Sequence, residues 1–345
     1  MVGLAEIVRR ARGQHSRELT TLPILALSVH SACNCRCVMC DIWKANAERR
    51  EITPEALAGH VEAMRRLHVQ RVMLTGGEPL LNRNLWALCE QLEAAGIRIT
   101  LITTGLLVES RSLAIARHVD TVVISLDGPA EVHDAIRRVK TGFARIAAGV
   151  VALRSAPSPP RLIARSVVQQ DNHLWLSETI AAALAMGFDE ISFLAADLSS
   201  SAFNRPEPWS AKRQAEVAVA PAQLAALDAS IARAQVAHAA AFSSGFVAGG
   251  IESLERIARY YRAVTGLGEY PAVHCNAPWV SAVLEPGGVL RPCFFHEPYA
   301  SSDGDLSDAL NSPAAVAFRR DLDVGSNATC RRCVCSLNLP LTRAV

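Results

Sequence analysis

Short apolar runs alternate with amphipathic stretches along residues 23–196. Six of these runs have the length and near-continuous hydrophobicity of buried strands, at residues 23–30, 71–76, 98–103, 120–128, 161–168 and 189–196. The segments between them include three with helical periodicity, at 53–67, 85–96 and 177–187. Thr53 followed by Pro54 indicates the start of one such helix. This order predicts an α/β fold with a parallel sheet covered by helices.

Polar motifs follow the predicted strands. A cysteine cluster comes after the first strand, Gly-Gly-Glu-Pro after the second, Thr-Thr-Gly after the third and Ser-Leu-Asp-Gly at the end of the fourth. Periodicity alone does not separate an open sheet from a barrel or a partial barrel. In each of these folds, functional groups gather at the C-terminal ends of the strands. We therefore expect the active site at that edge of the sheet.

The pattern changes after residue 196. A polar, proline-containing loop at 199–209 precedes two predicted helices, at about 221–242 and 251–263. From about residue 272 the chain has short strands and turns with cysteines, which we expect to form a small separate module of α+β type. The predicted division is an N-terminal helical extension at 1–22, a core at 23–220, a helical connection at 221–270 and the cysteine-rich module at 271–345.

Charge and cysteine content narrow the function. The net charge of +2, without a basic run, gives no electrostatic case for binding nucleic acid or an anionic membrane. The N-terminal residues contain arginines and no continuous apolar core, so we expect neither a signal peptide nor a membrane span. We therefore expect a cytoplasmic protein. The chain has ten cysteines, of which nine fall into two groups. Because the cytosol keeps thiols reduced, these groups point to metal rather than to disulfides.

Four cysteines fall within eight residues, and Cys33, Cys37 and Cys40 have the spacing C-x3-C-x2-C. Three thiolates on one loop can hold three irons of a [4Fe-4S] cube and leave the fourth iron open to a small chelating molecule. The alternative is a zinc knuckle that uses all four thiols, for which the spacing is cramped. We expect Cys35 to face away from the cube as a bystander, and Cys89 to be a core residue.

These motifs resemble the radical S-adenosylmethionine (SAM) enzymes over about residues 23–196. The resemblance is carried by the C-x3-C-x2-C loop with Asp-Ile-Trp behind it, by Leu74-Thr-Gly-Gly-Glu-Pro79, and by Ser125-Leu-Asp-Gly-Pro129 with Arg137 following. It implies a partial (β/α)6 TIM-like barrel of the radical SAM type, and a reduced cluster that cleaves SAM to a 5'-deoxyadenosyl radical. The SAM-site residues that it implies are Gly76, Gly77, Glu78, Pro79, Ser125, Asp127 and Arg137.

Simple chemistry agrees with this assignment. The two glycines let the backbone approach a ligand, and Glu78 offers a carboxylate to an ammonium group. Ser125 is placed to donate a hydrogen bond. Arg137 is suited to pair with a carboxylate, although Arg138 competes for that role and a solvated arginine on a helix surface is the alternative.

The C-terminal cysteines form a second group. Cys275, Cys293 and the C-x2-C pair of Cys330 and Cys333 resemble the "twitch" module of radical SAM enzymes, the short relative of the SPASM domain, which carries one auxiliary [4Fe-4S] cluster. Structural zinc competes with this interpretation, because four cysteines also satisfy a tetrahedral zinc ion. Cys335 departs from the pattern. It is a replacement ligand for Cys333, a redox or proton-donating group, or a spare thiol, and we favour the last.

The leading functional hypothesis is oxidation or rearrangement of a small polar metabolite, such as a sugar or aminocyclitol, with electrons from a donor such as flavodoxin or ferredoxin. Asp197, Asn204 and Arg205, in the loop after the sixth strand, are candidates for SAM or substrate contacts. Maturation of a ribosomally made peptide is the alternative. Only about 22 residues precede the first strand, which disfavours a leader-binding domain. A non-catalytic iron-sulfur or zinc sensor or scaffold is the hypothesis from a different class.

Overall fold

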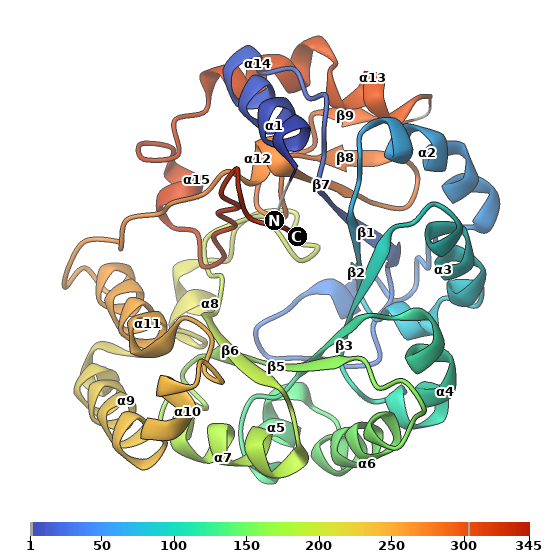
Figure 1. The fold of residues 1–345 in the computed structure, drawn as a ribbon. Coiled ribbons are helices and arrows are strands. Elements are labelled where there is room, and N and C mark those ends of the chain that lie inside the picture. The colour runs from blue at the N-terminus through green and yellow to red at the C-terminus, as the bar shows by residue number, and fades with distance from the viewer. Residues whose placement is uncertain (1–2, 303) are drawn as a thin grey trace.

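A curved sheet surrounded by helices organises the computed structural model, which describes residues 3–302 and 304–345 (Figure 1). The sheet has nine strands in the order β6-β5-β4-β3-β2-β1-β7-β8-β9. Every pairing from β6 to β7 is parallel, and β8 and β9 are added antiparallel. The strands are β1 (Ile24–His30), β2 (Arg71–Gly76), β3 (Arg98–Thr103), β4 (Thr121–Ser125), β5 (Arg161–Val168), β6 (Glu190–Ala195), β7 (Ser281–Leu284), β8 (Val289–Arg291) and β9 (Ala300–Ser301).

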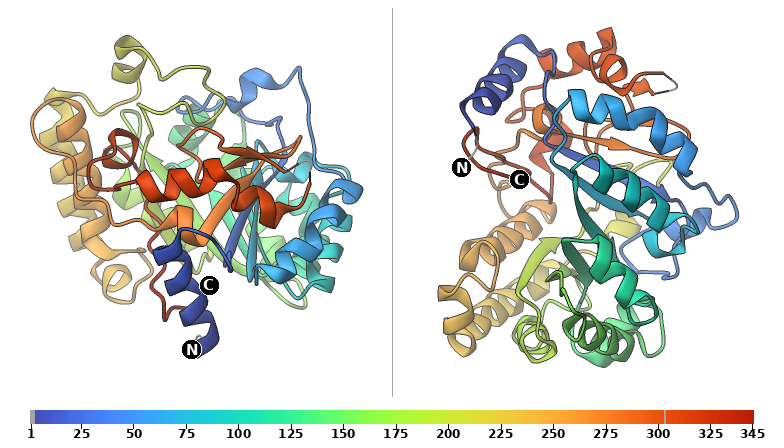
Figure 2. Two further views of the ribbon diagram at one scale, coloured as in Figure 1. Left: turned by 90° about the horizontal axis from the view of Figure 1, so that it is seen from above. Right: turned by 45° about the vertical axis from the view of Figure 1, so that its right-hand side comes forward.

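Helices connect the strands and cover the outside of the sheet, as both further views show (Figure 2). Neighbouring helices pack on each other around the outside. Along the barrel they are α2 (Pro54–Arg66), α3 (Leu85–Ala94), α4 (Val108–His118), α5 (Ala130–Arg137), α6 (Gly142–Arg154) and α7 (Leu176–Met186). Short 3-10 turns are η1 (Ile42–Ala45), η2 (Pro79–Leu81) and η3 (Pro221–Gln223).

The remaining helices lie at the two ends of the sheet. Helices α9 and α11 pack against α7 and β6, whereas α13 packs against α2. They are α1 (Leu4–Ser16), α8 (Ala211–Ala215), α9 (Leu224–Ala237), α10 (Ala239–Ser243), α11 (Gly250–Val264), α12 (Ala277–Val280), α13 (Leu306–Leu310), α14 (Pro313–Asp321) and α15 (Ala328–Arg331). Helix α1 lies beside the C-terminal segment, where the buried Arg10 donates from Nη1 to the carbonyl of Arg343 at 2.8 Å.

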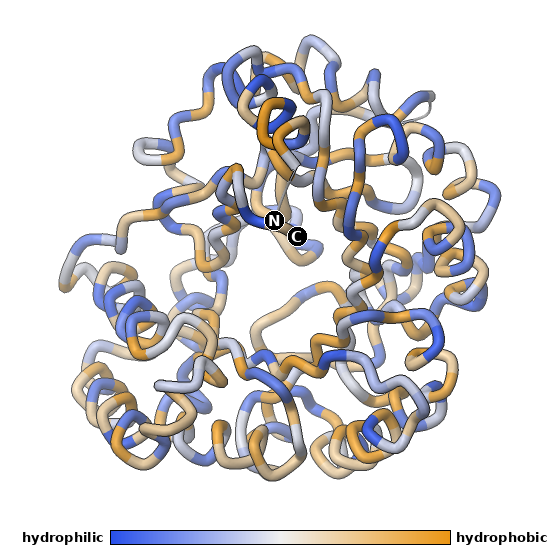
Figure 3. Tube along the Cα trace, viewed as in Figure 1, coloured by the Kyte–Doolittle hydropathy of each residue, from blue (hydrophilic) through white to orange (hydrophobic). Residues whose placement is uncertain are grey.

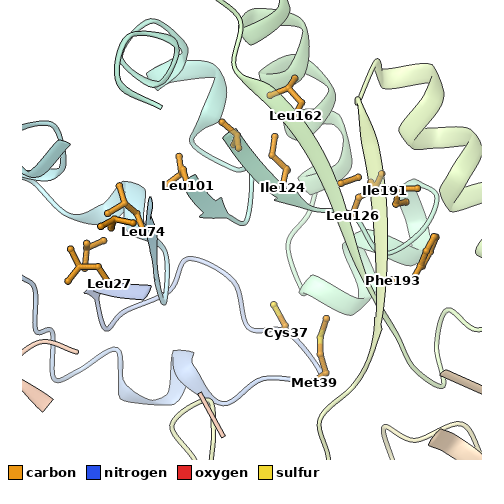
Figure 4. Close-up of a cluster of buried hydrophobic side chains, with 14 of the residues drawn as sticks. Leu27, Cys37, Met39, Leu74, Leu101, Ile124, Leu126, Leu162, Ile191 and Phe193 are labelled. Atoms are coloured by element: carbon orange, nitrogen blue, oxygen red, sulfur yellow. The ribbon is translucent and has the colours of Figure 1, made fainter. Parts of the chain in front are cut away.

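The core lies between the strands and their helices. Leu27, Leu74 and Leu101 are register partners on β1, β2 and β3, and all three are fully buried (Figure 4). On β5 the alternate residues Ile163, Arg165 and Val167 are only half-buried, because they face the inside of the barrel. Figure 3, coloured by hydropathy, shows hydrophobic residues along the strands and on the helices around them. Among the described residues, none of the helices has the length and hydrophobicity needed to cross a membrane.

The predicted fold class is confirmed, and the six predicted strands correspond to β1 through β6. Helices α4, α5 and α6 were not predicted. The C-terminal cysteine-rich region was expected to form a small separate module, and the structure shows that its strands join the barrel sheet. Strand β7 pairs in parallel with β1 from Ile24↔Ser281 to Leu27↔Leu284, so β7, β8 and β9 extend the barrel sheet. Because this pairing joins distant segments, local sequence patterns carry no sign of it.

Candidate functional site

The cysteine loop after β1 is held on both sides by hydrogen bonds to its backbone. The Asn46 amide accepts from the N–H of Cys33 and donates to its carbonyl, both at 2.9 Å. Further along, the N–H of Val38 donates to the carbonyl of Ile136, at the end of α5, at 3.0 Å. The loop conformation therefore depends on α5 and on the turn around η1.

The long loop after β6 holds the same segment from the other side. Arg205 donates from Nη2 to the carbonyl of Met39 at 3.4 Å, and Trp209 Nε1 donates to Asp41 Oδ2 at 2.8 Å. Arg213 also donates to the carbonyl of Val38. Sequence reasoning missed Trp209 and Arg213, and no motif could have indicated them, since their partners lie far away in the sequence.

The four thiols of the loop differ in their surroundings. Cys35 and Cys37 are buried, whereas Cys33 and Cys40 are half-buried. A hydrogen bond from Cys35, together with the guanidinium of Arg137, lowers the pKa of Cys37 to about 6. Burial raises the pKa of Cys33 and of Cys40 to about 12. Cys35 is buried in the loop, and its expected orientation away from the cube stays a prediction.

Arg137 joins this loop to the fourth strand. Its Nε donates to Asp127 Oδ2 at 2.5 Å, and its Nη1 lies 3.6 Å from the sulfur of Cys37. Both members of the ion pair are buried, and the other oxygen of Asp127 accepts from the N–H of Val167 at 2.8 Å. Although burial opposes it, the Asp127 carboxylate raises the pKa of Arg137. The alternative of a solvated surface arginine is therefore wrong, and the side chain faces the cysteine loop.

The Gly-Gly-Glu-Pro segment packs against the start of the cysteine loop. The N–H of Gly77 donates to the carbonyl of His30 at 2.7 Å, and the N–H of Glu78 donates to that of Ala32 at 2.9 Å. A Cβ on Gly77 would stand 2.1 Å from the Ala32 oxygen. Glycine is thus required at position 77 because the two backbone segments approach too closely for a Cβ. The expected approach of a ligand to this backbone remains a prediction.

The side chain of Glu78 is turned into the protein. Its two carboxylate oxygens accept four hydrogen bonds of 2.7–3.1 Å, from the backbone N–H groups of Leu80 and Thr104 and from the hydroxyls of Thr103 and Thr104. Burial raises the pKa of this carboxyl group. Glu78 therefore ties the ends of β2 and β3 together. The expected contact between its carboxylate and an ammonium group remains a prediction.

A cavity of about 490 Å³ opens at the C-terminal ends of β1 and β2. Gly76 and Gly77 border it on the strand side, and Asn204 and Arg205 border it from the loop after β6. Asp197 does not line it but forms a buried ion pair with Arg205 at 2.6 Å. Of the three candidate substrate residues, the structure thus brings two to the cavity and uses the third as a support.

A second cavity, of about 340 Å³, is bordered by all five C-terminal cysteines. It extends into the barrel, where Ala26 and Met73 form part of its wall. The His296 ring nitrogen Nε2 lies 3.3 Å from the Cys330 sulfur. The two cavities share Val283 and Phe294 in their walls, so they are adjacent. Cys335, predicted as the odd thiol, borders the cavity together with the expected ligands.

Both groups of thiols suit iron by their donor chemistry. Within residues 3–302 and 304–345, no three His, Cys, Asp or Glu side chains are placed to hold a single metal ion. Three cysteines on one loop provide the number of sulfur ligands that a cluster with one open iron takes, and Arg137 places a positive charge 3.6 Å from one of them, Cys37. In the second region, five cysteines around one cavity provide more than the four thiolates that a fully ligated cluster takes.

The family comparison agrees with the motifs. Residues 27–170 match the family described as the radical SAM superfamily. Among curated proteins, AdoMet-dependent heme synthase of Methanosarcina barkeri is 26% identical over 174 residues, which make up 49% of this chain and 49% of that protein. Mycofactocin maturase MftC of Mycolicibacterium smegmatis is 31% identical over 134 residues, 38% of this chain and 34% of that protein. The matched regions therefore span about half or less of these relatives.

Solved structures share the fold over more of the chain. SuiB of Streptococcus suis bound to S-adenosylmethionine superposes with a TM-score of 0.59 at 14% identity, covering 94% of this chain and 75% of that one. The structure of anSMEcpe with bound AdoMet gives a TM-score of 0.64 at 17% identity, covering 91% of this chain and 83% of that one. At these identities the likeness establishes the fold alone.

Proposed function

We propose, on the premise that residues 27–170 form a domain of the radical SAM superfamily, that this chain is a radical SAM enzyme with an auxiliary iron-sulfur cluster. The observation that carries the proposal is the joining of three elements at one end of the barrel. These are the thiol loop beside Arg137, the Gly-Gly-Glu-Pro segment packed against that loop, and the cavity bordered by Gly76 and Gly77.

Cys33, Cys37 and Cys40 are the proposed ligands of the SAM-binding cluster. Held by these residues, a reduced [4Fe-4S] cluster would supply the electron for cleavage of SAM to methionine and a 5'-deoxyadenosyl radical, the species that would take a hydrogen atom from the substrate. The residues of the chain bind and orient. Arg137 keeps a positive charge next to the Cys37 sulfur, and Gly76, Gly77 and Pro79 form the strand-end backbone along which SAM is proposed to lie. Ser125, at the end of β4, is proposed to donate a hydrogen bond to SAM.

The auxiliary cluster is proposed to be held by Cys275, Cys293, Cys330 and Cys333. Their convergence on one cavity next to the first supports this proposal. A substrate in the first cavity would lie between SAM and this cluster, which is a suitable place for an acceptor of the second electron of an oxidation. A reduced flavodoxin or ferredoxin is the proposed electron donor.

Oxidation of a small polar molecule is the reaction we favour. The first cavity presents hydroxyl, amide and charged groups, among them Thr75, Asn204 and Arg291. A peptide is the second candidate. It is favoured by the likeness to MftC, named as a maturase, and to the fold of SuiB, which was also solved with its precursor peptide SuiA.

The test is anaerobic reconstitution of the full chain, followed by reduction in the presence of SAM and measurement of 5'-deoxyadenosine. We expect this product, and we expect the Cys37→Ala variant to form none. If the reconstituted protein contains both clusters and cleaves no SAM, the chain is an iron-sulfur sensor or scaffold. Mixing deuterated sugars, aminocyclitols and peptides with the enzyme then identifies the substrate, because deuterium appears in the 5'-deoxyadenosine.

Iron and sulfide counting tests the auxiliary cluster separately. In a Cys33→Ala/Cys37→Ala/Cys40→Ala variant, about four irons per chain should remain. Zinc in their place, or no metal at all, would contradict the proposed second cluster without affecting the first.

A further inference from the structure

Arg165 is the only arginine, lysine, aspartate or glutamate among the described residues that border the C-terminal cysteine cavity. It projects from β5 toward the inside of the barrel. Ala26 on β1 and Val283 on β7 border the same cavity. Three strands separate β5 from β1 in the sheet (Figure 1). Because Arg165 borders the same cavity as the cysteines, we infer that it approaches them from across the barrel interior.

The terminal nitrogens of Arg165 are not used by the protein. Its Nε donates to Ser192 Oγ on β6 at 3.2 Å. Across residues 3–302 and 304–345, neither Nη1 nor Nη2 of Arg165 has a hydrogen bond or ion pair. The hydrogen bond to Ser192 fixes the side chain in position and leaves two nitrogens for whatever occupies the cavity.

Among the described residues, the rest of the cavity wall has no Arg, Lys, Asp or Glu side chain. Apart from Arg165, the wall consists of thiols, apolar side chains, a few hydroxyls and His296. A four-iron cluster with thiolate ligands carries net negative charge, and negative charge is costly to bury among apolar groups unless a cation lies near it. Arg165 and all five C-terminal cysteines border this one cavity, so the guanidinium is the fixed charge that faces them.

We propose that Arg165 is the counter-charge of the auxiliary cluster and raises the reduction potential of that cluster. The inference rests on the proposed function, because it requires a cluster in this cavity. Reduction adds one electron to the cluster, from dithionite or a reduced flavodoxin, and makes or breaks no bond. A fixed cation stabilises the reduced state, which has one more negative charge, more than it stabilises the oxidised state. Arg165 is thus a positioning residue that acts through the cluster.

The test measures the midpoint potential of the auxiliary cluster by EPR-monitored titration of the full chain. The background is the Cys33→Ala/Cys37→Ala/Cys40→Ala variant, so that only the auxiliary cluster contributes a signal. We expect Arg165→Gln to shift the midpoint to lower potential at unchanged iron content, and Arg165→Lys to return most of that shift. The matched control is Arg161→Gln. Arg161 lies on the same strand but is exposed and pairs with Glu190 at 2.6 Å, so its loss should leave the potential unchanged.

The outcomes separate this inference from the proposed function. If the parent variant binds no iron, the auxiliary cluster itself is disproved. If Arg165→Gln keeps its iron and the wild-type potential, the counter-charge role is overturned while the cluster stands. Arg165 would then serve another anion, such as a substrate carboxylate. Loss of the cluster in Arg165→Gln but not in Arg165→Lys supports a requirement for charge, whereas loss in both contradicts it.

Discussion

The cysteine loop after β1 and the five C-terminal cysteines become thiol-rich regions by different routes. The first places four thiols on one short loop, and the rest of the protein then fixes that loop through Arg137, Asn46 and Arg205. The second gathers thiols from separate segments, the turn before α12, the end of the β8 hairpin and the residues around α15, into one cavity wall. The first region is therefore specified by local spacing, and the second by the tertiary fold.

The difference shows in what each region needs from its neighbours. In the first region, charge is provided by a buried ion pair that also links two elements, since Asp127 lies just after β4 and Arg137 ends α5. In the second region, Arg165 has no carboxylate partner among the described residues. If the two regions are independent, a substitution in the first should remove its iron or lower the stability of the fold without removing the iron of the second.

The largest effect is expected from Cys37→Ala. This variant should lose the iron of the first region and all formation of 5'-deoxyadenosine, because it removes the proposed ligand whose sulfur lies next to Arg137. About four irons per chain should remain in the second region. Cys35→Ala is the matched control. It removes a buried thiol from the same loop, and we expect about eight irons to be retained. Loss of about four irons per chain in Cys35→Ala would instead show that Cys35 is a ligand in the first region.

A smaller effect is expected from Asp127→Asn. The change leaves the buried Arg137 without its anionic partner, which should lower the free energy of unfolding by about 3–5 kcal/mol, as breaking a buried pair does. Urea unfolding of the metal-free protein measures it. The matched control is Asp228→Asn, whose ion pair with Arg262 is partly exposed to solvent and should contribute less than about 1 kcal/mol. Equal losses in the two variants would contradict the supporting role of Arg137.

The smallest of the three effects is expected from Gly77→Ala. The new Cβ would meet the Ala32 oxygen, so the segment must shift, at a cost of about 1–3 kcal/mol. Gly59→Ala is the control. A Cβ at that position on α2 meets nothing within 4 Å, and alanine should stabilise the helix by about 0.5–1 kcal/mol. Thermal unfolding of both variants distinguishes them. A Gly77→Ala variant as stable as the wild type would mean that the two backbones are less closely packed than described.

Much of the barrel could be predicted from the sequence, because it rests on local signals. Strands β2, β3 and β5 begin and end at the predicted residues, since each is a compact apolar run between polar turns. The pairing of β7 with β1 could not be predicted, because neither strand carries information about the other. The same reason explains why Trp209 and Arg213 were missed, while the buried state of Arg137 depends on an aspartate that lies on a different element.

Side-chain direction was the other limit of the sequence analysis. For Cys35, the divergence of successive side chains in a tight loop suggested a bystander that points away from the cube; the structure shows that its side chain is buried, and its role stays a prediction. For Glu78, a carboxylate next to two glycines suggested a ligand contact, and the structure uses it to join β2 and β3. A motif identifies which residues belong to a site, whereas the packing around them decides where each side chain points and what it contacts.

The pairing of β1 with β7 has a consequence for how the protein is made. During synthesis, β1 and the cysteine loop leave the ribosome long before β7 exists, so one edge of β1 stays unpaired while most of the chain is being added. Unpaired strand edges are prone to aggregation, and distant pairings form slowly. The nascent barrel therefore passes through a period in which the free edge of its first strand needs protection. Iron would have to enter the first loop either after β7 has paired with β1 or while the barrel is still incomplete.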